Sequence, residues 1–231
     1  MSICSAKNRI RISQQSLYSK IAGAGGFDCY TLWAIVKAIE AGVKVDIVVS
    51  NDVSLSDGGY TGGLFTVLTA LTSMYVGLRK KIFAPPIDPP RHYLAEWAEA
   101  SLKSPTYELP IVVRHKSWNS DEYNPYLNEL NERLSVAQLY HSPQVNYWKV
   151  GAEQKPAGNH AKVYIIDDTH FYVGSDNMYL SGTSHGLQEY GYLIEGQSET
   201  RDFIAKYWDR LWKNSSQAVV KAGKNNISFV T

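Results

Sequence analysis

The sequence predicts an α/β fold in which a mixed β-sheet is flanked by helices on both faces. Two patterns support this fold class. Residues 9–49 contain a strand, a helix and a second strand in succession, and residues 161–173 contain two apolar strands separated by a polar turn. A strand–helix–strand unit favours parallel pairing with the helix packed on the sheet, whereas a hairpin pairs its strands antiparallel. The same sheet is therefore expected to hold both kinds of pairing.

The first unit is predicted from three adjacent patterns. Residues 9–13 alternate polar and apolar side chains, which indicates a half-buried strand. Across residues 31–40 the apolar side chains recur at helical spacing. Gly42 then indicates the end of the helix, and residues 43–49 form the apolar run that is typical of a buried strand.

The remaining elements are predicted in the same way. In chain order they are a helix at 66–79, a helix at 93–102, a strand at 109–113, a helix at 125–134 capped by Asn124, a short strand at 139–140, strands at 161–166, 171–173 and 190–195, and a helix at 199–212. A glycine-rich stretch at 58–63 is predicted to be a loop on the substrate side. No repeat or low-complexity tract divides the chain, so we predict one domain over residues 1–231.

Composition narrows the choice of partners. The chain has 23 basic and 22 acidic residues, a net charge of +1, so no overall basic field favours nucleic acid. No stretch reaches the roughly 20 apolar residues that a membrane helix needs, and the first residues lack the apolar run of a signal peptide. We therefore predict no transmembrane segment and leave the cellular location open. Cys4 and Cys29 permit either one disulfide or two thiols.

The chemistry is concentrated in one stretch near the predicted hairpin. His160 and Lys162 are two residues apart, so on a strand they project from the same face. An imidazole beside an ammonium supplies a nucleophile and a cation, which phosphoryl transfer requires. Asp167 follows at odd spacing and ends the strand, so we expect it to hold structure or balance charge.

A second turn, Gly174-Ser175-Asp176-Asn177, follows the next strand. A hairpin would bring this turn beside His160, where Ser175 and Asn177 could donate hydrogen bonds to phosphate oxygens. Glycine at 174 would permit a close backbone approach. The hairpin turn itself is predicted at residues 168–170, which would place His170 on the surface.

This combination, His-x-Lys-x4-Asp followed by Gly-Ser-x-Asn, resembles the signature of the phospholipase D superfamily at every fixed position. Residues 12–17, 41–45, 58–60 and 187–192 also resemble the C-terminal lobe of secreted bacterial phospholipases D, so the resemblance runs from about residue 10 to about residue 212. It implies the phospholipase D fold for the predicted sheet and helices. A secreted enzyme or a delivered effector would be compatible with such relatives.

The resemblance also implies a mechanism and a role for each matching residue. One histidine attacks phosphorus and a second, on a facing lobe, protonates the leaving alcohol, with no metal or other cofactor. His160 would take one of these roles, Lys162 would bind phosphate, and Ser175 and Asn177 would support it. A carboxylate at the place of Glu189 would orient the histidine of the partner lobe, so the predicted catalytic residues are His160, Lys162, Asp167 and Glu189.

This chain departs from the two-lobed pattern because it has a single His-x-Lys. A second lobe from another chain or from a missing N-terminal half, a self-sufficient homodimer, or loss of activity would each account for it. We rank a phosphodiesterase acting on phospholipid at a membrane surface, by hydrolysis or by transfer to another alcohol, above a homodimeric endonuclease. The third alternative is an inactive binding module. Headgroup preference stays open.

Overall fold

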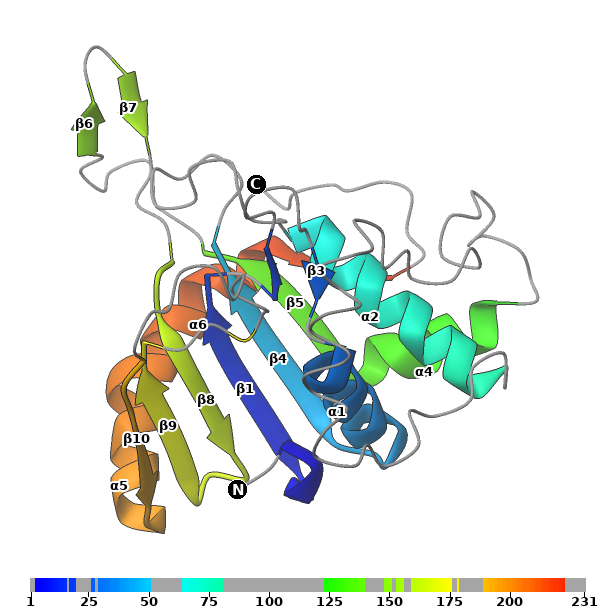
Figure 1. The fold of residues 1–231 in the computed structure, drawn as a ribbon, viewed down its shortest axis with the longest axis horizontal. Helices are drawn as coiled ribbons and strands as arrows, with labels where there is room; N and C mark the ends of the chain where they lie inside the picture. The colour runs from blue at the N-terminus through cyan, green and yellow to red at the C-terminus, as the bar shows by residue number, and fades with distance from the viewer. Residues whose placement is uncertain are drawn as a thin grey trace.

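The computed structural model describes residues 3–15, 17–19, 26–27, 29–50, 64–80, 123–139, 148–150, 153–155, 159–175, 178 and 189–222. Its main feature is a seven-stranded sheet with the strand order β10-β9-β8-β1-β4-β5-β11 (Figure 1). Two short hairpins, β2 (Tyr18–Ser19) with β3 (Gly26–Phe27) and β6 (Trp148–Val150) with β7 (Glu153–Lys155), lie outside this sheet.

The predicted strand–helix–strand unit is confirmed. Strand β1 (Arg9–Gln14) is followed by helix α1 (Cys29–Glu40) and strand β4 (Lys44–Val49), and the two strands pair in parallel. A 3-10 turn, η1 (Ile3–Ser5), precedes β1 and packs on α1. Gly42 has a φ of +98°, which glycine adopts without strain, so the chain turns sharply from α1 into β4.

The predicted hairpin is confirmed as well, and it makes the sheet mixed. Strands β8 (Lys162–Ile166) and β9 (His170–Gly174) pair antiparallel, and β8 also pairs antiparallel with β1. Strand β10 (Gly191–Glu195) completes this side as an edge strand on β9. On the other side, β5 (Leu134–Gln138) is parallel to β4, and the short β11 (Val219–Val220) is antiparallel to β5.

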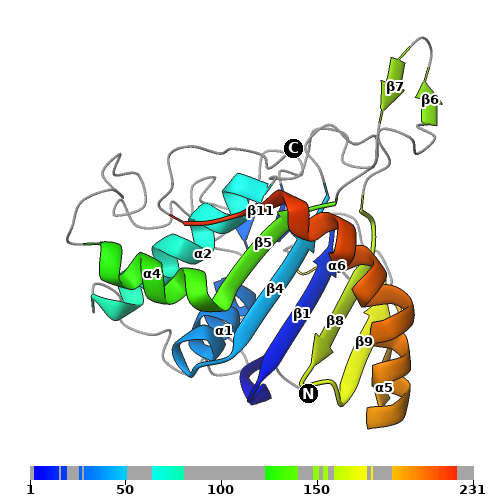
Figure 2. The ribbon, with the colours of Figure 1, turned by 180° about the vertical axis from the view of Figure 1, so that it is seen from behind.

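Two apolar cores cover the two faces of the sheet, as predicted. On one face, Ile10, Ile12 and Ile47 pack with side chains of α1, α2 (Leu64–Arg79) and α4 (Asn124–Arg133). On the other face, Val163 and Ile165 pack with the C-terminal helical segment. Figure 1 shows α1 in front of the sheet, and Figure 2, the view from behind, shows α5 and α6 lying across the opposite face.

The region around residue 134 corrects the prediction. The helix begins at Asn124 and ends at Arg133, and its N-cap is Tyr123 without a side-chain cap hydrogen bond, so the prediction of Asn124 as the cap is wrong. Of the strand predicted at 139–140, Leu139 follows strand β5 (Leu134–Gln138) and is not part of it, and Tyr140 lies outside the described residues. Leu127, Leu130 and Leu134 stand at helical spacing, so the pattern alone extended the helix one residue too far.

The closing helix is longer than predicted and is irregular. It runs as α5 (Gln197–Phe203), a π-helical turn (Ile204–Trp208), α6 (Asp209–Ser215) and a 3-10 turn, η7 (Ser216–Ala218). Such a π-helical turn inserts one residue into a helix and is frequent near functional sites. Here Ile204 and Trp208 of this turn are buried against the sheet.

Some predictions lie outside the described residues: the helix at 93–102, the strand at 109–113 and the loop at 58–63. Within the described part of the chain, no helix combines the length and the apolar character that crossing a bilayer demands.

Candidate active site

Four of the six predicted site residues gather at one edge of the sheet. Lys162 is the first residue of β8 and His160 lies two residues before it, Ser175 follows the end of β9, and Glu189 precedes β10. Because β8 and β10 are both antiparallel to β9, these three positions fall at the same end of the sheet. Asn177 lies outside the described residues. Asp167, at the far end of β8, is not part of this group.

The His160 and Lys162 side chains are paired, as their spacing predicted. The Lys162 Nζ lies 3.2 Å from His160 Nδ1 and donates a hydrogen bond to the His160 backbone carbonyl at 3.0 Å. Lys162 is buried, whereas His160 is exposed. An ammonium has only donors, so Nδ1 must accept, and the proton of the neutral ring then belongs on Nε2. The pair therefore consists of an exposed imidazole whose Nδ1 contacts a buried ammonium.

Gln14 lies directly across the sheet from Lys162. The two residues are register partners in the β1–β8 pair, and Gln14 is fully buried. Its Oε1 accepts a hydrogen bond from the Met178 backbone N–H at 3.5 Å. This contact joins the end of β1 to the segment that follows the Gly174–Asn177 turn.

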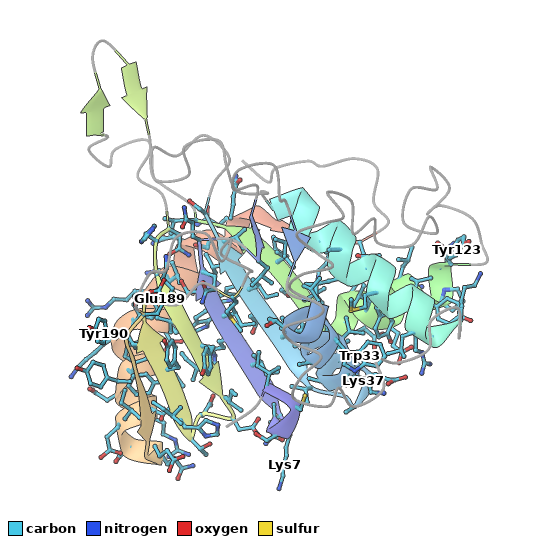
Figure 3. The ribbon with its side chains drawn as sticks, in the orientation of Figure 1. Lys7, Trp33, Lys37, Tyr123, Glu189 and Tyr190 are labelled. Carbon is cyan, nitrogen blue, oxygen red and sulfur yellow. The ribbon has the colours of Figure 1, made fainter. Side chains whose placement is uncertain are left out.

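Ser175 directly follows β9, and Glu189 and Tyr190 directly precede β10, where Figure 3 labels them. The Ser175 backbone N–H donates to the Tyr190 carbonyl at 2.8 Å, and the Tyr190 N–H donates to Ser175 Oγ at 2.8 Å. Ser175 Oγ also donates to the Tyr190 carbonyl at 3.2 Å. The Ser175 hydroxyl, predicted as a phosphate donor, is therefore engaged with the residue next to Glu189.

The close approach predicted at Gly174 involves a neighbouring side chain. The ring of Tyr172 lies over Gly174 and over its register partner Gly191, so a Cβ at either position would overlap that ring. Tyr172 also stacks on Tyr164 with ring centroids 4.8 Å apart. The two glycines thus allow an aromatic pair to lie on the sheet beside the site.

Asp167 holds the opposite end of β8. Its carboxylate accepts hydrogen bonds from the backbone N–H groups of Lys7, Asn8 and Arg9 at 2.7, 2.7 and 2.9 Å. Its own N–H donates to the Arg9 carbonyl at 2.9 Å. Burial alone would raise the pKa of Asp167, but these backbone donors, with His170 nearby, lower it below its usual value of 3.8.

The hairpin turn occupies 167–169, one residue earlier than predicted. Asp167 and Asp168 have φ values of 51° and 57°, a left-handed conformation that aspartate tolerates better than most residues. The Asp168 carboxylate forms an ion pair with the buried Arg11. His170 is therefore the first residue of β9 and is half-buried, and its Nε2 is buried without a hydrogen-bond partner. The prediction that it lies in the turn is wrong, and its side chain is partly exposed.

Asn159, immediately before His160, is the residue that the sequence patterns missed. It is buried, and its Nδ2 lies 3.1 Å from each of the carbonyls of Gln14 and Val48 and from Ser13 Oγ. Its Oδ1 accepts from the Ala161 N–H at 3.1 Å. The signal in the sequence is slight: a single polar residue at the entry to an apolar strand.

Comparison with known proteins gives consistent matches. The family model described as "Cardiolipin synthase, PLD-like domain" matches residues 2–212. A phospholipase D from Streptomyces antibioticus is 26% identical over 216 residues, which are 94% of this chain and 31% of that protein. The chain thus spans about a third of the length of this curated relative.

Solved structures with a similar arrangement were also found. Nuc from Salmonella typhimurium, described as a phospholipase D family member, aligns over 96% of this chain and 87% of its own, with 13% identity and a TM-score of 0.44. NucT from Helicobacter pylori aligns over 95% and 85%, with 14% identity and a TM-score of 0.43. A phosphatidylserine synthase from Haemophilus influenzae aligns over 96% and 35%, with 12% identity and a TM-score of 0.43.

Proposed function

The chain belongs to the phospholipase D superfamily, and we propose that it acts as one catalytic lobe of a phosphodiesterase that cleaves the headgroup bond of a phospholipid. The observation that carries this proposal is the pair at the start of β8, where the Lys162 ammonium lies 3.2 Å from the Nδ1 of an exposed His160. A nucleophile that solvent can reach, next to a buried cation, suits attack on a phosphodiester.

In the proposed reaction, His160 Nε2 attacks phosphorus and the bond from phosphorus to the leaving alkoxide breaks. A second histidine, on another lobe, gives its proton to that alkoxide. Water then attacks the phosphohistidine, loses a proton to the second histidine, and the phosphorus–nitrogen bond breaks. A second alcohol in place of water would give phosphatidyl transfer. Neither step draws on an additional cofactor.

Lys162 is proposed to move between two acceptors. In the observed arrangement its ammonium donates to His160 Nδ1, which leaves the ring proton on Nε2, the atom that must attack. When a phosphate oxygen accepts the hydrogen bond of the Lys162 ammonium instead, the His160 ring proton can move from Nε2 to Nδ1. Nε2 then has a free lone pair and is nucleophilic. The same movement places positive charge on the phosphate, where negative charge develops in the transition state.

Glu189, Ser175 and Asn177 are proposed to complete the site. Glu189 would accept a hydrogen bond from the histidine of the second lobe and so fix its orientation. Ser175 and Asn177 would donate to phosphate oxygens, with Ser175 in a secondary role because its hydroxyl already contacts Tyr190. The second lobe would come from another copy of this chain or from another segment, and the reaction needs it in either case.

Two observations favour a phospholipid over a nucleic acid. The net charge is +1, and affinity for a nucleic-acid backbone depends on many Lys and Arg residues that neutralise phosphates. The relative from Streptomyces antibioticus, similar over 94% of this chain, is named a phospholipase D. A homodimeric endonuclease is the alternative outcome of the experiment below.

The test is a substrate comparison with the purified chain in a chelating buffer. We expect choline release from vesicles of phosphatidylcholine, or ethanolamine release from phosphatidylethanolamine, and no cleavage of plasmid or single-stranded DNA. His160→Ala should reduce the rate by at least about 10⁴-fold, because the nucleophile is lost. The matched control is His170→Gln, which changes the other histidine of the same hairpin and should retain activity.

Three results would revise the proposal. Cleavage of DNA without release of a lipid headgroup would replace the phospholipase with the nuclease. Equal activity of His160→Ala and the wild type would remove His160 from the mechanism. Absence of turnover on both substrates, by the dimer as well as the monomer, would exclude a second lobe from another copy of this chain and would leave a lobe from another segment or an inactive binding module.

A further inference from the structure

We propose that Asn159 is a positioning residue that sets the direction in which His160 projects. Asn159 is itself held by a hydrogen bond to Ser13, which in turn accepts one from Tyr207. This inference rests on the proposed function only for the role of His160 as nucleophile. The hydrogen bonds that carry it belong to a buried chain of side chains beneath the start of β8, and none of its members was predicted from the sequence.

The contacts of Asn159 converge on the backbone next to His160. Its Nδ2 lies 3.1 Å from the carbonyls of Gln14 and Val48, at the ends of β1 and β4, and its backbone N–H donates to Ser50 Oγ at 2.9 Å. Its Oδ1 holds the Ala161 N–H at 3.1 Å. The residues on both sides of His160 are thus fixed to the central strands, although His160 itself is exposed.

The chain continues to the helical layer on the opposite face. Asn159 Nδ2 lies 3.1 Å from Ser13 Oγ, and the hydroxyl of Tyr207 donates to the same Oγ at 2.8 Å. Tyr207 belongs to the π-helical turn Ile204–Trp208. A π-helical turn changes which side chains face the sheet compared with a regular α-helix. The irregular turn therefore serves to bring the Tyr207 hydroxyl to Ser13.

A small change in this chain would alter the reaction more than the fold. Attack on phosphorus needs the nucleophile in line with the leaving oxygen, and a displacement of about 1 Å can cost about a hundredfold in rate. The Asn159 side-chain amide contacts three acceptors and one donor, so an alanine there would loosen the segment 159–161 while leaving the His160 and Lys162 side chains in the protein.

The experiment compares two asparagines that bind backbone groups at different places. Asn131 donates from Nδ2 to the Ala222 carbonyl at 3.0 Å and accepts from the Ala222 N–H at 2.8 Å. This site joins α4 to the segment after β11, at the opposite edge of the sheet from β10. Asn131→Ala is therefore the matched control for the loss of an asparagine that holds backbone.

Two readouts are measured on the full chain. With bis(p-nitrophenyl) phosphate as substrate, Asn159→Ala should lower kcat by about a hundredfold with little change in KM, and Tyr207→Phe should lower it less. Asn131→Ala should lower the melting temperature but leave kcat unchanged. In parallel, the NMR signals of the His160 ring, assigned by comparison with His160→Ala, should shift in Asn159→Ala and Tyr207→Phe but not in Asn131→Ala.

The NMR readout keeps this inference separate from the proposed function. If the wild type turns over no phosphodiester, the proposed function fails, and the His160 signals still decide whether Asn159 positions the ring. Unshifted His160 signals in a folded Asn159→Ala would overturn the inference. So would a kcat for Asn159→Ala equal to that of Asn131→Ala at matched stability.

Discussion

The two ends of strand β8 differ in exposure and in hydrogen bonding, although one sequence motif covers both. At the first end, His160 is exposed and Lys162 is buried, with their side-chain nitrogens 3.2 Å apart. At the other end, the Asp167 carboxylate is saturated by three backbone N–H groups. The first end holds the two groups proposed to react with phosphate, whereas the second holds a carboxylate bonded to backbone N–H groups.

Within His-x-Lys-x4-Asp, the proposed function gives the reaction to His160 and Lys162 and leaves a structural role to Asp167. Asp167 fastens the turn of the hairpin to the segment that leads into β1, and so fixes β8 lengthwise against β1. The opposite end can then carry a buried ammonium, which is costly unless the surrounding backbone is well determined. Substitutions at the two ends should accordingly separate loss of activity from loss of stability.

After His160→Ala, the largest effect is expected at Lys162. Lys162→Met removes the charge that is proposed to bind phosphate and should lower the rate of phosphodiester hydrolysis by about 10³-fold. Its free energy of unfolding should not fall, because an apolar side chain of similar length replaces a buried ammonium. Turnover and urea unfolding of the same preparation test both statements.

Lys206→Met is the control for Lys162→Met. Lys206 is exposed and pairs with Asp202 one helical turn away, an ion pair worth a few tenths of a kcal/mol. Its removal should change neither readout. A rate for Lys162→Met within about tenfold of the wild type would show that the ammonium does not stabilise the transition state.

The second effect is expected at Asp167 and should appear in stability. Asp167→Ala leaves three backbone N–H groups without their acceptor and should cost about 2–3 kcal/mol of unfolding free energy. The rate per folded molecule should fall by less than about tenfold, because the site lies at the other end of the strand. Asp202→Ala, which removes an exposed carboxylate, is the control. A large loss of activity in a stable Asp167→Ala would give Asp167 a part in the chemistry.

The Asp167 contribution should also depend on pH. Its pKa is lower in the folded protein than the ordinary value of 3.8, so the ionised carboxylate stabilises the fold. This contribution is fully present above 3.8 and is lost as the pH falls through the folded pKa. Asp167→Asn lacks it at every pH, so the stability difference between wild type and Asp167→Asn should shrink as the pH is lowered from about 6 to about 3.

His170 would contribute to that measurement, so both proteins are compared with His170→Gln in place. Burial lowers the pKa of His170 below 6.5, more than the nearby carboxylates of Asp167 and Glu195 raise it, and Asp167→Asn would remove one of these carboxylates. With His170→Gln in both proteins, the difference between them reports Asp167. A difference that stays constant down to about pH 3 would show that the Asp167 carboxylate has no lowered pKa.

Local patterns explain why some of this structure was predictable. The β1–α1–β4 unit and the β8–β9 hairpin follow from apolar periodicity and turn residues that lie next to one another in the chain. The pairing of His160 with Lys162 follows from strand parity alone. The lone Asp167 carboxylate was expected to be structural because it ends the strand at odd spacing, and its three backbone partners agree with that expectation.

The features that were missed depend on contacts between distant segments. Leu134 fits a helical stripe, and only its pairing with Val45 of β4 makes it the first residue of a strand. Asn159 meets Gln14 and Val48 across more than a hundred residues of sequence. The π-helical turn leaves no mark in the apolar pattern of the closing helix, because one inserted residue does not disrupt the periodicity of so short a segment.

The smallest effect is expected at Ser175. This residue lies at the same end of the sheet as His160 and Lys162, but its hydroxyl bonds to the backbone of Tyr190. Ser175→Ala removes the acceptor of the Tyr190 N–H and should cost about 1 kcal/mol of stability. Because Lys162 is proposed to supply the charge that binds phosphate, the rate should fall by less than about tenfold. Ser175→Thr, which keeps the hydroxyl, should restore both. A loss of about a hundredfold or more for Ser175→Ala at unchanged stability would instead make the hydroxyl a principal phosphate donor. The candidate site would then include the end of β9 as well as the start of β8.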